Sequence, residues 1–187
     1  CRNFFNLEAV IKKITGFKYV IPTHQGRAAE ELICYALDLN GDKVAISNQF
    51  FDTTLANIET SGAKTLELVR SEAFDTSAIL DFKGDIDCDR LEEAIQENHN
   101  VALILLTITN NTGGGQPVSL ANIKRVSQIA KQHKIPFFLD AARFAENVYF
   151  IKLREDGYKN KTPREIAREL FSYTDGCLVS AKKDGLV

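Results

Sequence analysis

Six short apolar segments alternate with amphipathic stretches along the chain, and this alternation limits the possible folds more than any other feature of the sequence. Most of the segments are continuously apolar, which is typical of strands covered on both faces. They span residues 19–22, 43–47, 64–69, 101–108, 136–140 and 176–180. The amphipathic stretches predict helices at residues 7–15, 27–37, 91–98, 120–133, 142–152 and 162–171. Such alternation implies right-handed crossovers, so we predict an α/β fold with a largely parallel sheet flanked by helices.

The composition is that of a soluble globular protein. Apolar residues make up 44% of the 187 residues and charged residues 26%, so the chain can bury a core, and one domain is the default for this length. The formal net charge of −2 gives no electrostatic reason to expect nucleic acid or an anionic membrane surface. No apolar run approaches the roughly 18 residues of a membrane helix. We therefore expect neither nucleic acid nor a membrane as a partner.

The cysteines and the two ends of the chain suggest the redox environment of the protein and whether the sequence is complete. Cys1, Cys34, Cys88 and Cys177 are widely spaced and form no CxxC pair, so we expect reduced thiols and a cytoplasmic protein. The chain begins with Cys rather than Met, and it ends just after an apolar strand segment. We expect it to be a fragment, with sequence missing on both sides.

Polar segments follow five of the predicted strands. They are THQGR at 23–27, NQFFDTT at 48–54, TNNTGGGQP at 109–117, DAAR at 140–143 and SAKKD at 180–184. In a parallel sheet the carboxyl ends of the strands meet at one edge, which is where ligands bind in open α/β folds. The sequence therefore predicts a ligand site at this rim.

Two glycine-bearing segments each allow two interpretations. Gln25, Gly26 and Arg27 open a predicted helix, whose free N–H groups and dipole favour an anion; alternatively, the glycine only eases a turn. The run at 113–115 invites a phosphate-loop interpretation, but it lacks the GKS/T ending and the GxGxxG spacing, so a flexible turn explains it equally well. Asn111, just upstream, can bind a ring oxygen of a ligand or form a turn.

A carboxylate and an aromatic ring also lie on the predicted rim. Asp140 ends a strand, where burial would demand a cation or a metal, although an exposed helix N-cap is the alternative. Arg143 follows at the start of the next helix. Phe51 is either a core residue or a platform for a planar ring, with Asp52 beside it. No spacing of His, Cys, Asp and Glu supports a metal site.

The SAKKD segment adds two adjacent lysines, Lys182 and Lys183. A lysine that is desolvated or lies beside another cation loses its proton more easily and becomes a nucleophile. An anion-binding helix start, a carboxylate, a ring platform and such a lysine together suit pyridoxal 5'-phosphate, which needs a Schiff-base lysine and an acidic partner for its ring nitrogen. We therefore predict this cofactor.

Five longer motifs resemble one known family. They are VIPTHQGRAAE, SNQFFDTT, GGGQPVSLANIK, DAARFAENVYFIK and SYTDGCLVSAKKDGLV. The chain resembles the β-eliminating lyases, the family of tryptophanase and tyrosine phenol-lyase, in register from Asn3 to Val187. The resemblance implies the aspartate-aminotransferase-like fold. It also implies that residues 1–187 cover most of the large cofactor-binding domain, without an N-terminal segment and the C-terminal small domain.

The resemblance implies roles for the residues that would hold the cofactor's phosphate and ring. Gln25, Gly26 and Arg27 match the family's phosphate-binding turn, which Ser180 assists. For the pyridine ring, Phe51 matches the residue that stacks on it, Asn111 and Arg143 match the pair that faces its phenolic oxygen, and Asp140 matches the partner of its nitrogen.

For the reaction, Lys183 matches the Schiff-base lysine and Lys182 a neighbour close to the cofactor. The implied activity is β-elimination, with tryptophan cleaved to indole, pyruvate and ammonium. Asp52 favours tryptophan because tyrosine phenol-lyases have Thr there, whereas Asn57 stands where both subfamilies lead us to expect His. The alternatives are tyrosine phenol-lyase activity, another β-eliminating lyase, or an inactive folding or assembly unit.

The resemblance further implies potassium, bound largely by residues outside this chain, a homo-tetramer, an amino-acid substrate and a place in amino-acid catabolism. These expectations depend on the resemblance alone, because neither composition nor spacing in this sequence addresses them.

Overall fold

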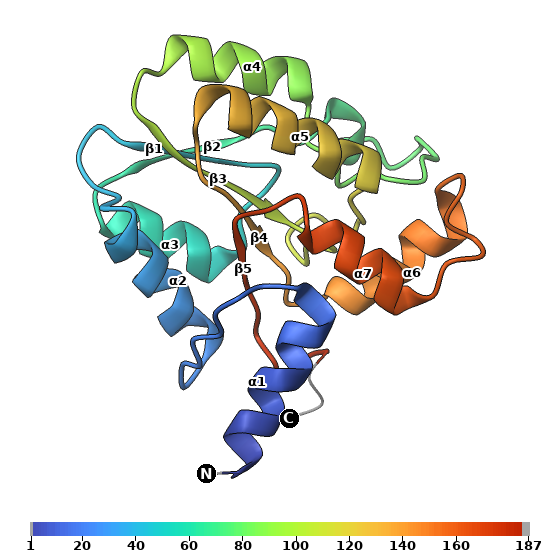
Figure 1. Ribbon diagram of the computed structural model, residues 1–187. Helices are drawn as coiled ribbons and strands as arrows, with labels where there is room; N and C mark the ends of the chain where they lie inside the picture. Colours follow the sequence, from blue (N-terminus) through green and yellow to red (C-terminus); the bar gives the residue numbers. More distant parts are fainter. Residues whose placement is uncertain (1, 185–187) are drawn as a thin grey trace.

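The computed structural model describes residues 2–184 and places one parallel five-stranded sheet at the centre of the chain (Figure 1). The strands are β1 (Val44–Ser47), β2 (Lys64–Glu67), β3 (Val101–Thr107), β4 (Phe137–Asp140) and β5 (Gly176–Leu178). Their order across the sheet is β2-β1-β3-β4-β5. Every pairing is parallel, which confirms the predicted α/β fold.

Seven helices and one 3₁₀ turn are found within the described residues. They are α1 (Arg2–Thr15), α2 (Gly26–Ala36), α3 (Asp52–Thr60), η1 (Ser71–Phe74), α4 (Cys88–Glu97), α5 (Leu120–His133), α6 (Phe144–Arg154) and α7 (Pro163–Phe171). Side chains fix two of the helix starts: Ser119 accepts from Asn122 N at 3.0 Å, and Thr162 and Glu165 form a capping box. No helix within residues 2–184 is long and apolar enough to cross a membrane.

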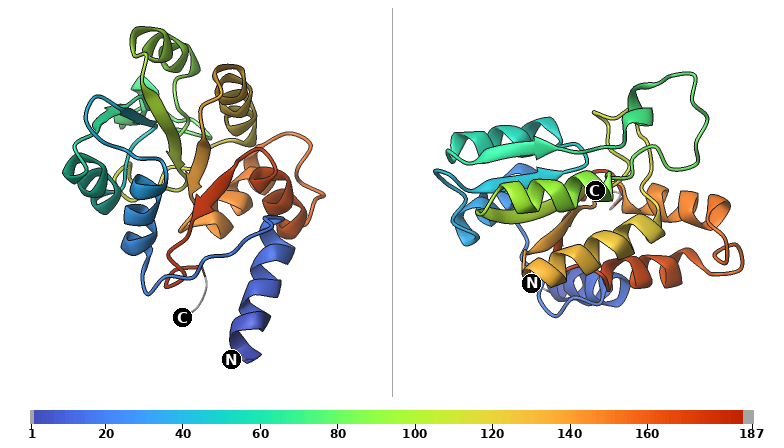
Figure 2. Two further views of the ribbon diagram at one scale, coloured as in Figure 1. Left: turned by 60° about the vertical axis from the view of Figure 1, so that its left-hand side comes forward. Right: turned by 90° about the horizontal axis from the view of Figure 1, so that it is seen from above.

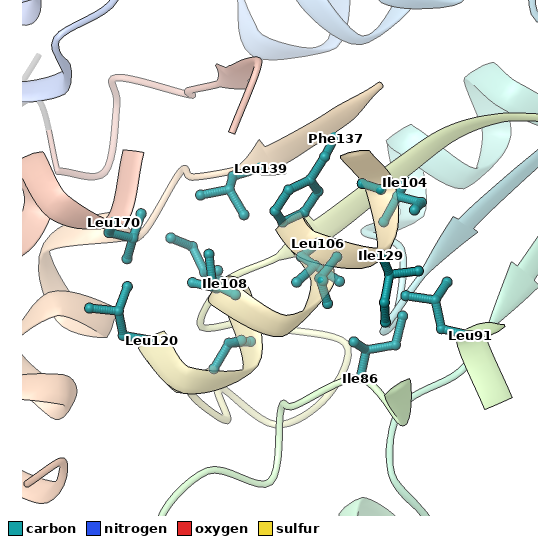
Figure 3. Packing of buried hydrophobic residues seen from close by; sticks show 14 of the residues in the cluster. Ile86, Leu91, Ile104, Leu106, Ile108, Leu120, Ile129, Phe137, Leu139 and Leu170 are labelled. Carbon is teal, nitrogen blue, oxygen red and sulfur yellow. The ribbon is translucent and has the colours of Figure 1, made fainter. Parts of the chain in front are cut away.

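Helices cover both faces of the sheet (Figure 2). The central strands β1 and β3 bury side chains on both faces, which explains why their segments are continuously apolar. Ile46, Ile104 and Leu106 point into a cluster with α4, α5, α6 and α7, part of which Figure 3 shows. The intervening residues Leu103 and Leu105 point to the other face, where α2 and α3 cover them. The core therefore lies in two layers, one on each side of the sheet.

Two predictions of local structure were wrong. Residues 19–22 form no strand: Tyr19 is 72% exposed and Ile21 78% exposed, so their apolar character does not reflect burial in the sheet. The segment 48–54 was predicted only as a loop, but α3 begins within it at Asp52. An acidic residue in the first turn of a helix is favoured by the helix dipole, and this signal was available in the sequence.

Cys34, Cys88 and Cys177 are free thiols, and burial raises the pKa of each. Cys1 lies outside the described residues. Burial and a raised pKa disfavour the reactive thiolate, so these three cysteines act as small apolar side chains.

Candidate functional site

The carboxyl ends of the central strands meet at one edge of the sheet. Thr107 of β3 is paired with Asp140 of β4, and Asp140 is paired with Leu178 of β5. Backbone hydrogen bonds continue past these pairs, from Ile108 N to Asp140 O at 3.1 Å and from Ala141 N to Leu178 O at 2.8 Å. The segments that follow β3, β4 and β5 therefore leave the sheet side by side, as predicted for the rim.

Asp140 lies at the centre of this rim and is only 8% exposed. Burial raises its pKa to about 6, and the charge of Glu30 adds to the rise. The backbone N–H of Ala142, 3.3 Å from Oδ1, and the charge of Lys183 lower it. The alternative of an exposed helix cap is wrong, because Asp140 is buried and the N-cap residue of α6 is Arg143.

Lys183 is half-buried, and its side chain lies near the ring expected to stack on the cofactor. Its Nζ is 5.8 Å from the centre of the Phe51 ring, and its charge reaches Asp140. Its backbone N–H donates to Ser180 O at 3.3 Å, in the turn that follows β5. Lys182 is exposed. Of the two lysines, Lys183 is thus the one near both the ring and the carboxylate.

The two adjacent phenylalanines before α3 differ in burial. Phe50 is fully buried in the core, and its N–H donates to Glu67 Oε1 at 2.8 Å. Phe51 is half-buried at the N-cap position of α3 and is the ring that Lys183 approaches. Asp52 is exposed at the first position of the helix, where its Oδ1 accepts from Thr53 N at 2.7 Å.

The start of α2 faces the segment that follows β5. Gln25 is the N-cap residue, and its side chain caps no backbone N–H. Gly26 lies so close to Ser180 that a Cβ added to it would be 3.2 Å from the Ser180 Cβ. Arg27 is exposed beside this contact. A helix start with a hydroxyl and a guanidinium next to it suits an anionic group.

A cavity of about 360 Å³ lies at the end of β3 and brings Asn111 and Arg143 together. Its lining residues are Thr109, Asn111, Gly114, Gly115, Arg143 and Glu146. Gly114 and Gly115 have φ of +73° and +71°, and Gly115 N donates to Asn110 O at 2.7 Å. The glycines thus serve a tight turn that presents Asn111, which favours the turn interpretation over the phosphate loop.

Asn147, which the sequence analysis missed, holds both ends of this glycine turn. Its Oδ1 accepts from Thr109 Oγ1 at 3.2 Å and from Val118 N at 2.9 Å, and its Nδ2 donates to Val118 O at 2.9 Å. Asn147 is fully buried on α6. Thr109 has a φ of +53°, which is strained for a β-branched residue, so the contact with Asn147 keeps the chain in a conformation it would otherwise leave.

Asn48 is a second buried amide that the sequence analysis missed. Its Nδ2 donates to Gly84 O at 2.8 Å and to Thr107 O at 3.0 Å, and its Oδ1 accepts from Thr107 N at 2.9 Å. These bonds join the end of β1 to the end of β3. No signal in the sequence reveals them, because the partners are backbone groups far along the chain.

Asp184 joins the turn that carries Lys183 to the start of α6. Its Oδ2 accepts from Ala145 N at 2.7 Å, which places the carboxylate at the positive end of the helix. Burial and the neighbouring Glu146 raise the pKa of Asp184 to about 6. Glu146 also contacts Arg143, with 3.5 Å between Oε1 and Nη1. The residues that line the cavity are therefore linked to the turn that carries Lys183.

No group of three or more His, Cys, Asp or Glu residues within 2–184 is arranged to hold a metal ion. The rim instead combines a buried carboxyl group, a half-buried lysine, an aromatic ring, an amide–guanidinium pair and a helix start. These groups can hold a planar aromatic ring with an anionic substituent and place an amine beside it.

Comparison with known proteins connects this arrangement to one family. The family model described as "Beta-eliminating lyase" matches residues 1–187. A probable beta-eliminating lyase from Trichomonas vaginalis is 52% identical over 99% of this chain and 40% of its own length. A tryptophanase from Salinibacter ruber is 49% identical over 99% of this chain and 39% of its own length. A tyrosine phenol-lyase from Fusobacterium nucleatum is 46% identical over 100% of this chain and 41% of its own length.

The chain thus spans about two fifths of the length of these curated relatives. Among solved structures, one chain of the SepCysS–SepCysE N-terminal domain complex superposes with a TM-score of 0.70 over 96% of this chain and 42% of its own length. Its sequence identity is 22%, so this likeness concerns the fold alone.

Proposed function

The chain belongs to the β-eliminating lyase family, and we propose that it forms most of the large cofactor-binding domain of a pyridoxal 5'-phosphate enzyme that cleaves aromatic amino acids by β-elimination. The observation that carries this proposal is the position of Lys183, whose Nζ lies 5.8 Å from the Phe51 ring and whose charge reaches the buried Asp140. An amine between a stacking surface and a carboxyl group is the arrangement that this cofactor requires.

The described residues fit the cofactor. Asp140 is buried with a single backbone donor at 3.3 Å, so a protonated ring nitrogen would supply the partner that a buried carboxylate needs. Asn111 and Arg143 line one cavity and can both donate to a ring oxygen. Gly26 lies against Ser180, with 3.2 Å between an added Cβ and the Ser180 Cβ, and the free N–H groups of this helix start suit a phosphate.

In this assignment each residue has one task. Phe51 would stack on the ring, Asp140 would pair with its protonated nitrogen, and Lys183 would hold the cofactor through its amine. When bound, the cofactor supplies an electron sink for the charge that develops on the substrate α-carbon. The amine of Lys183 would be the base that takes the α-proton. Lys182 is exposed beside it and, by resemblance to the family, would be a neighbour of the cofactor.

Tryptophan is the substrate that we propose, on the basis of Asp52. Its carboxylate is exposed at the start of α3, one residue after the stacking ring, where it can exchange a proton with the nitrogen of an indole leaving group. The relatives do not decide the substrate, since a tryptophanase and a tyrosine phenol-lyase are 49% and 46% identical to this chain. A phenol leaving group is the alternative that the product test below distinguishes.

From family membership we further propose an amino-acid substrate, a homo-tetramer, cytoplasmic location, a role in amino-acid catabolism and a potassium ion bound largely by residues beyond this chain. These are properties of the whole enzyme, of which residues 1–187 form the part described above.

Borohydride trapping tests the cofactor assignment. The chain is incubated with pyridoxal 5'-phosphate, reduced with borohydride and digested, and the modified peptide is mapped by mass spectrometry. We expect a pyridoxyl label on Lys183, loss of the label in Lys183→Arg, and its retention in Lys182→Arg. A label on Lys182 or on surface lysines would overturn the residue assignment, and no label would overturn the proposal that these residues hold the cofactor.

Product analysis tests the substrate. The full-length enzyme is incubated separately with tryptophan, tyrosine and O-substituted serines, and indole, phenol and pyruvate are measured. We expect indole and pyruvate from tryptophan, with a shift toward phenol release from tyrosine in Asp52→Thr. Phenol as the main product of the unchanged enzyme would contradict the choice of tryptophan without affecting the cofactor assignment.

A further inference from the structure

Glu30 is a buried carboxylate that the proposed reaction leaves without a task. It lies on α2 and is only 7% exposed. Burying a carboxylate is costly unless its oxygens accept hydrogen bonds. Both oxygens do so here: Oε1 accepts from Thr53 Oγ1 at 3.0 Å, and Oε2 accepts from Asn57 Nδ2 at 3.0 Å. Both donors belong to α3, so a single side chain of α2 is bound entirely by the neighbouring helix.

A second contact extends this connection to the start of α2. The same Asn57 Nδ2 lies 3.4 Å from the carbonyl oxygen of Arg27, in the first turn of that helix. Glu30 and Asn57 thus join the first turn of α2 to α3. Below them, Ile33 and Ile58 belong to the same apolar cluster, so the polar contacts lie at the rim end of a packed helix pair.

The two joined helix starts carry different parts of the candidate site. The start of α2 carries Gly26 and Arg27, which are suited to an anion, and the start of α3 follows Phe51, which is suited to a planar ring. One cofactor would contact both at once, so the separation between the two starts decides whether phosphate and ring can be held together.

We infer that Glu30 is a positioning residue, which uses its hydrogen bonds to Thr53 and Asn57 to fix the anion-binding turn of α2 relative to the ring platform at Phe51. This inference depends on the proposed function for its consequence in cofactor binding, but the tether itself is a property of the folded chain. The affinity for pyridoxal 5'-phosphate then depends on a residue that does not touch the cofactor.

Asn57 gives the tether a feature particular to this chain. The family resemblance leads us to expect His at this position, and a neutral imidazole has one N–H to donate. The Asn57 amide has two, which match its two acceptors, Glu30 Oε2 and Arg27 O. The amide does not titrate, so the tether in this chain keeps its geometry across the pH range in which an imidazole would change its charge.

Two substitutions of Glu30 separate the hydrogen bonds from the charge. Glu30→Gln removes the charge but keeps both contacts. The carbonyl oxygen of the glutamine accepts from Asn57, and its amide donates to the Thr53 hydroxyl, which becomes an acceptor instead of a donor. Glu30→Met keeps the volume and removes both contacts. Glu31→Met is the matched control, since Glu31 is the next residue of α2 and is exposed.

The first measurement is hydrogen exchange of the cofactor-free chain, followed by mass spectrometry. In Glu30→Met we expect exchange to accelerate by about tenfold or more at residues 26–30 and, together with them, at residues 52–57. In Glu30→Gln and Glu31→Met both segments should stay within about twofold of the unchanged chain. Acceleration of only one segment, or of neither, would overturn the inference, as would equal acceleration in Glu30→Gln.

The second measurement is the affinity for pyridoxal 5'-phosphate, titrated by its absorbance. We expect Glu30→Met to weaken binding by about tenfold and Glu30→Gln to restore it. If the unchanged chain bound no cofactor, the proposed function would fail, while the exchange result would still decide whether the tether exists. Should Glu30→Met not fold, the double variant Thr53→Ala/Asn57→Ala removes the same two hydrogen bonds from the side of α3 and is tested by the same two measurements.

Discussion

The two sides of the candidate site are held in different ways. The buried side contains Asn48 and the glycine turn held by Asn147, and the protein itself supplies the hydrogen-bond partners of these groups. It also contains Asp140, which has one backbone donor and a second partner only when a ligand is bound. The open side consists of residues 25–27 and 180–183, most of them exposed, and Gly26 contacts Ser180 across it.

This difference indicates which groups of the site are already held in place in the folded chain and which become ordered only when a ligand binds. Preorganised groups cost little to use in binding, whereas groups that must be ordered reduce affinity. We expect substitutions on the buried side to change the free energy of unfolding, and substitutions on the open side to change ligand affinity with little effect on stability. The predictions below test this division, starting with the largest effect.

Replacing Asn147 by Leu should destabilise the chain most. The change keeps the volume but leaves Thr109 Oγ1 and both backbone groups of Val118 buried without their partner. We expect a loss of about 3 kcal/mol or more in the free energy of unfolding, measured by urea denaturation. Tyr149→Ala, at an exposed position of the same helix, is the control and should cost about 0.5 kcal/mol or less. Similar losses in both variants would contradict the preformed buried side.

Replacing Asp140 by Asn should stabilise the cofactor-free chain at neutral and alkaline pH. The folded-state pKa of Asp140 is raised from 3.8 to about 6, so the folded chain holds its proton more tightly than the unfolded chain. The stability contributed by this residue therefore falls as the pH rises from about 4 to about 6 and stays low above that range. We expect a gain of about 2 kcal/mol at pH 8 and a smaller gain at pH 5, measured from urea midpoints.

Asp85 also contributes to the pH dependence of stability, because burial raises its pKa to about 6 as well. It is present in the unchanged chain and in Asp140→Asn, so its contribution cancels when the two are compared. Only the difference between the two pH profiles reports Asp140. A difference that grows toward low pH would show that the sign is wrong and that Asp140 is stabilised as a carboxylate in the absence of the cofactor.

Replacing Gly114 by Ala should have an intermediate effect. Its φ is +73°, which a residue with a side chain rarely adopts, while the space around an added Cβ is open. Because Asn147 clips both ends of the turn, the turn is not free to relax, and we expect a cost of about 1 kcal/mol in the free energy of unfolding. No measurable change in the free energy of unfolding would mean that the turn can change its conformation despite its hydrogen bonds to Asn147.

Replacing Gly26 by Ala should change stability least and cofactor affinity clearly. The added Cβ would be 3.2 Å from the Ser180 Cβ, so the two segments must separate by a few tenths of an ångström. We expect a cost of about 0.5 kcal/mol or less in unfolding. Because the shift moves the helix start away from Ser180, binding of pyridoxal 5'-phosphate should weaken several-fold in an absorbance titration. A large loss of stability with unchanged cofactor binding would contradict the view that the open side serves ligand affinity rather than stability.

The sequence predicted the sheet and its rim because both depend on local patterns. Continuously apolar segments such as residues 101–108 indicate doubly covered strands, and parallel pairing places whatever follows them at one edge. The predicted helices differ from the observed ones mainly at their ends, where patterns give least information. The strand predicted at residues 19–22 failed because apolar character alone does not supply a neighbouring strand.

The polar groups that support the site were not predictable from sequence. Asn147, Asn48 and Glu30 look like ordinary surface residues until the fold brings their partners to them. Those partners are distant: Asn147 binds Val118, Asn48 binds Thr107, and Glu30 binds Asn57. The residues expected to contact a ligand were suggested by their chemistry and position after strands, whereas the residues that hold them are recognisable only from three-dimensional contacts.

The order of the strands has a consequence for how the chain is made. β5, at the edge of the sheet, is the last of the five strands in the sequence, and Lys183 follows it. β1, β2, β3 and β4 precede that lysine in the sequence, so they are synthesised before it is added. Most of the sheet is therefore synthesised before the chain contains the lysine that we propose as the attachment point of the cofactor.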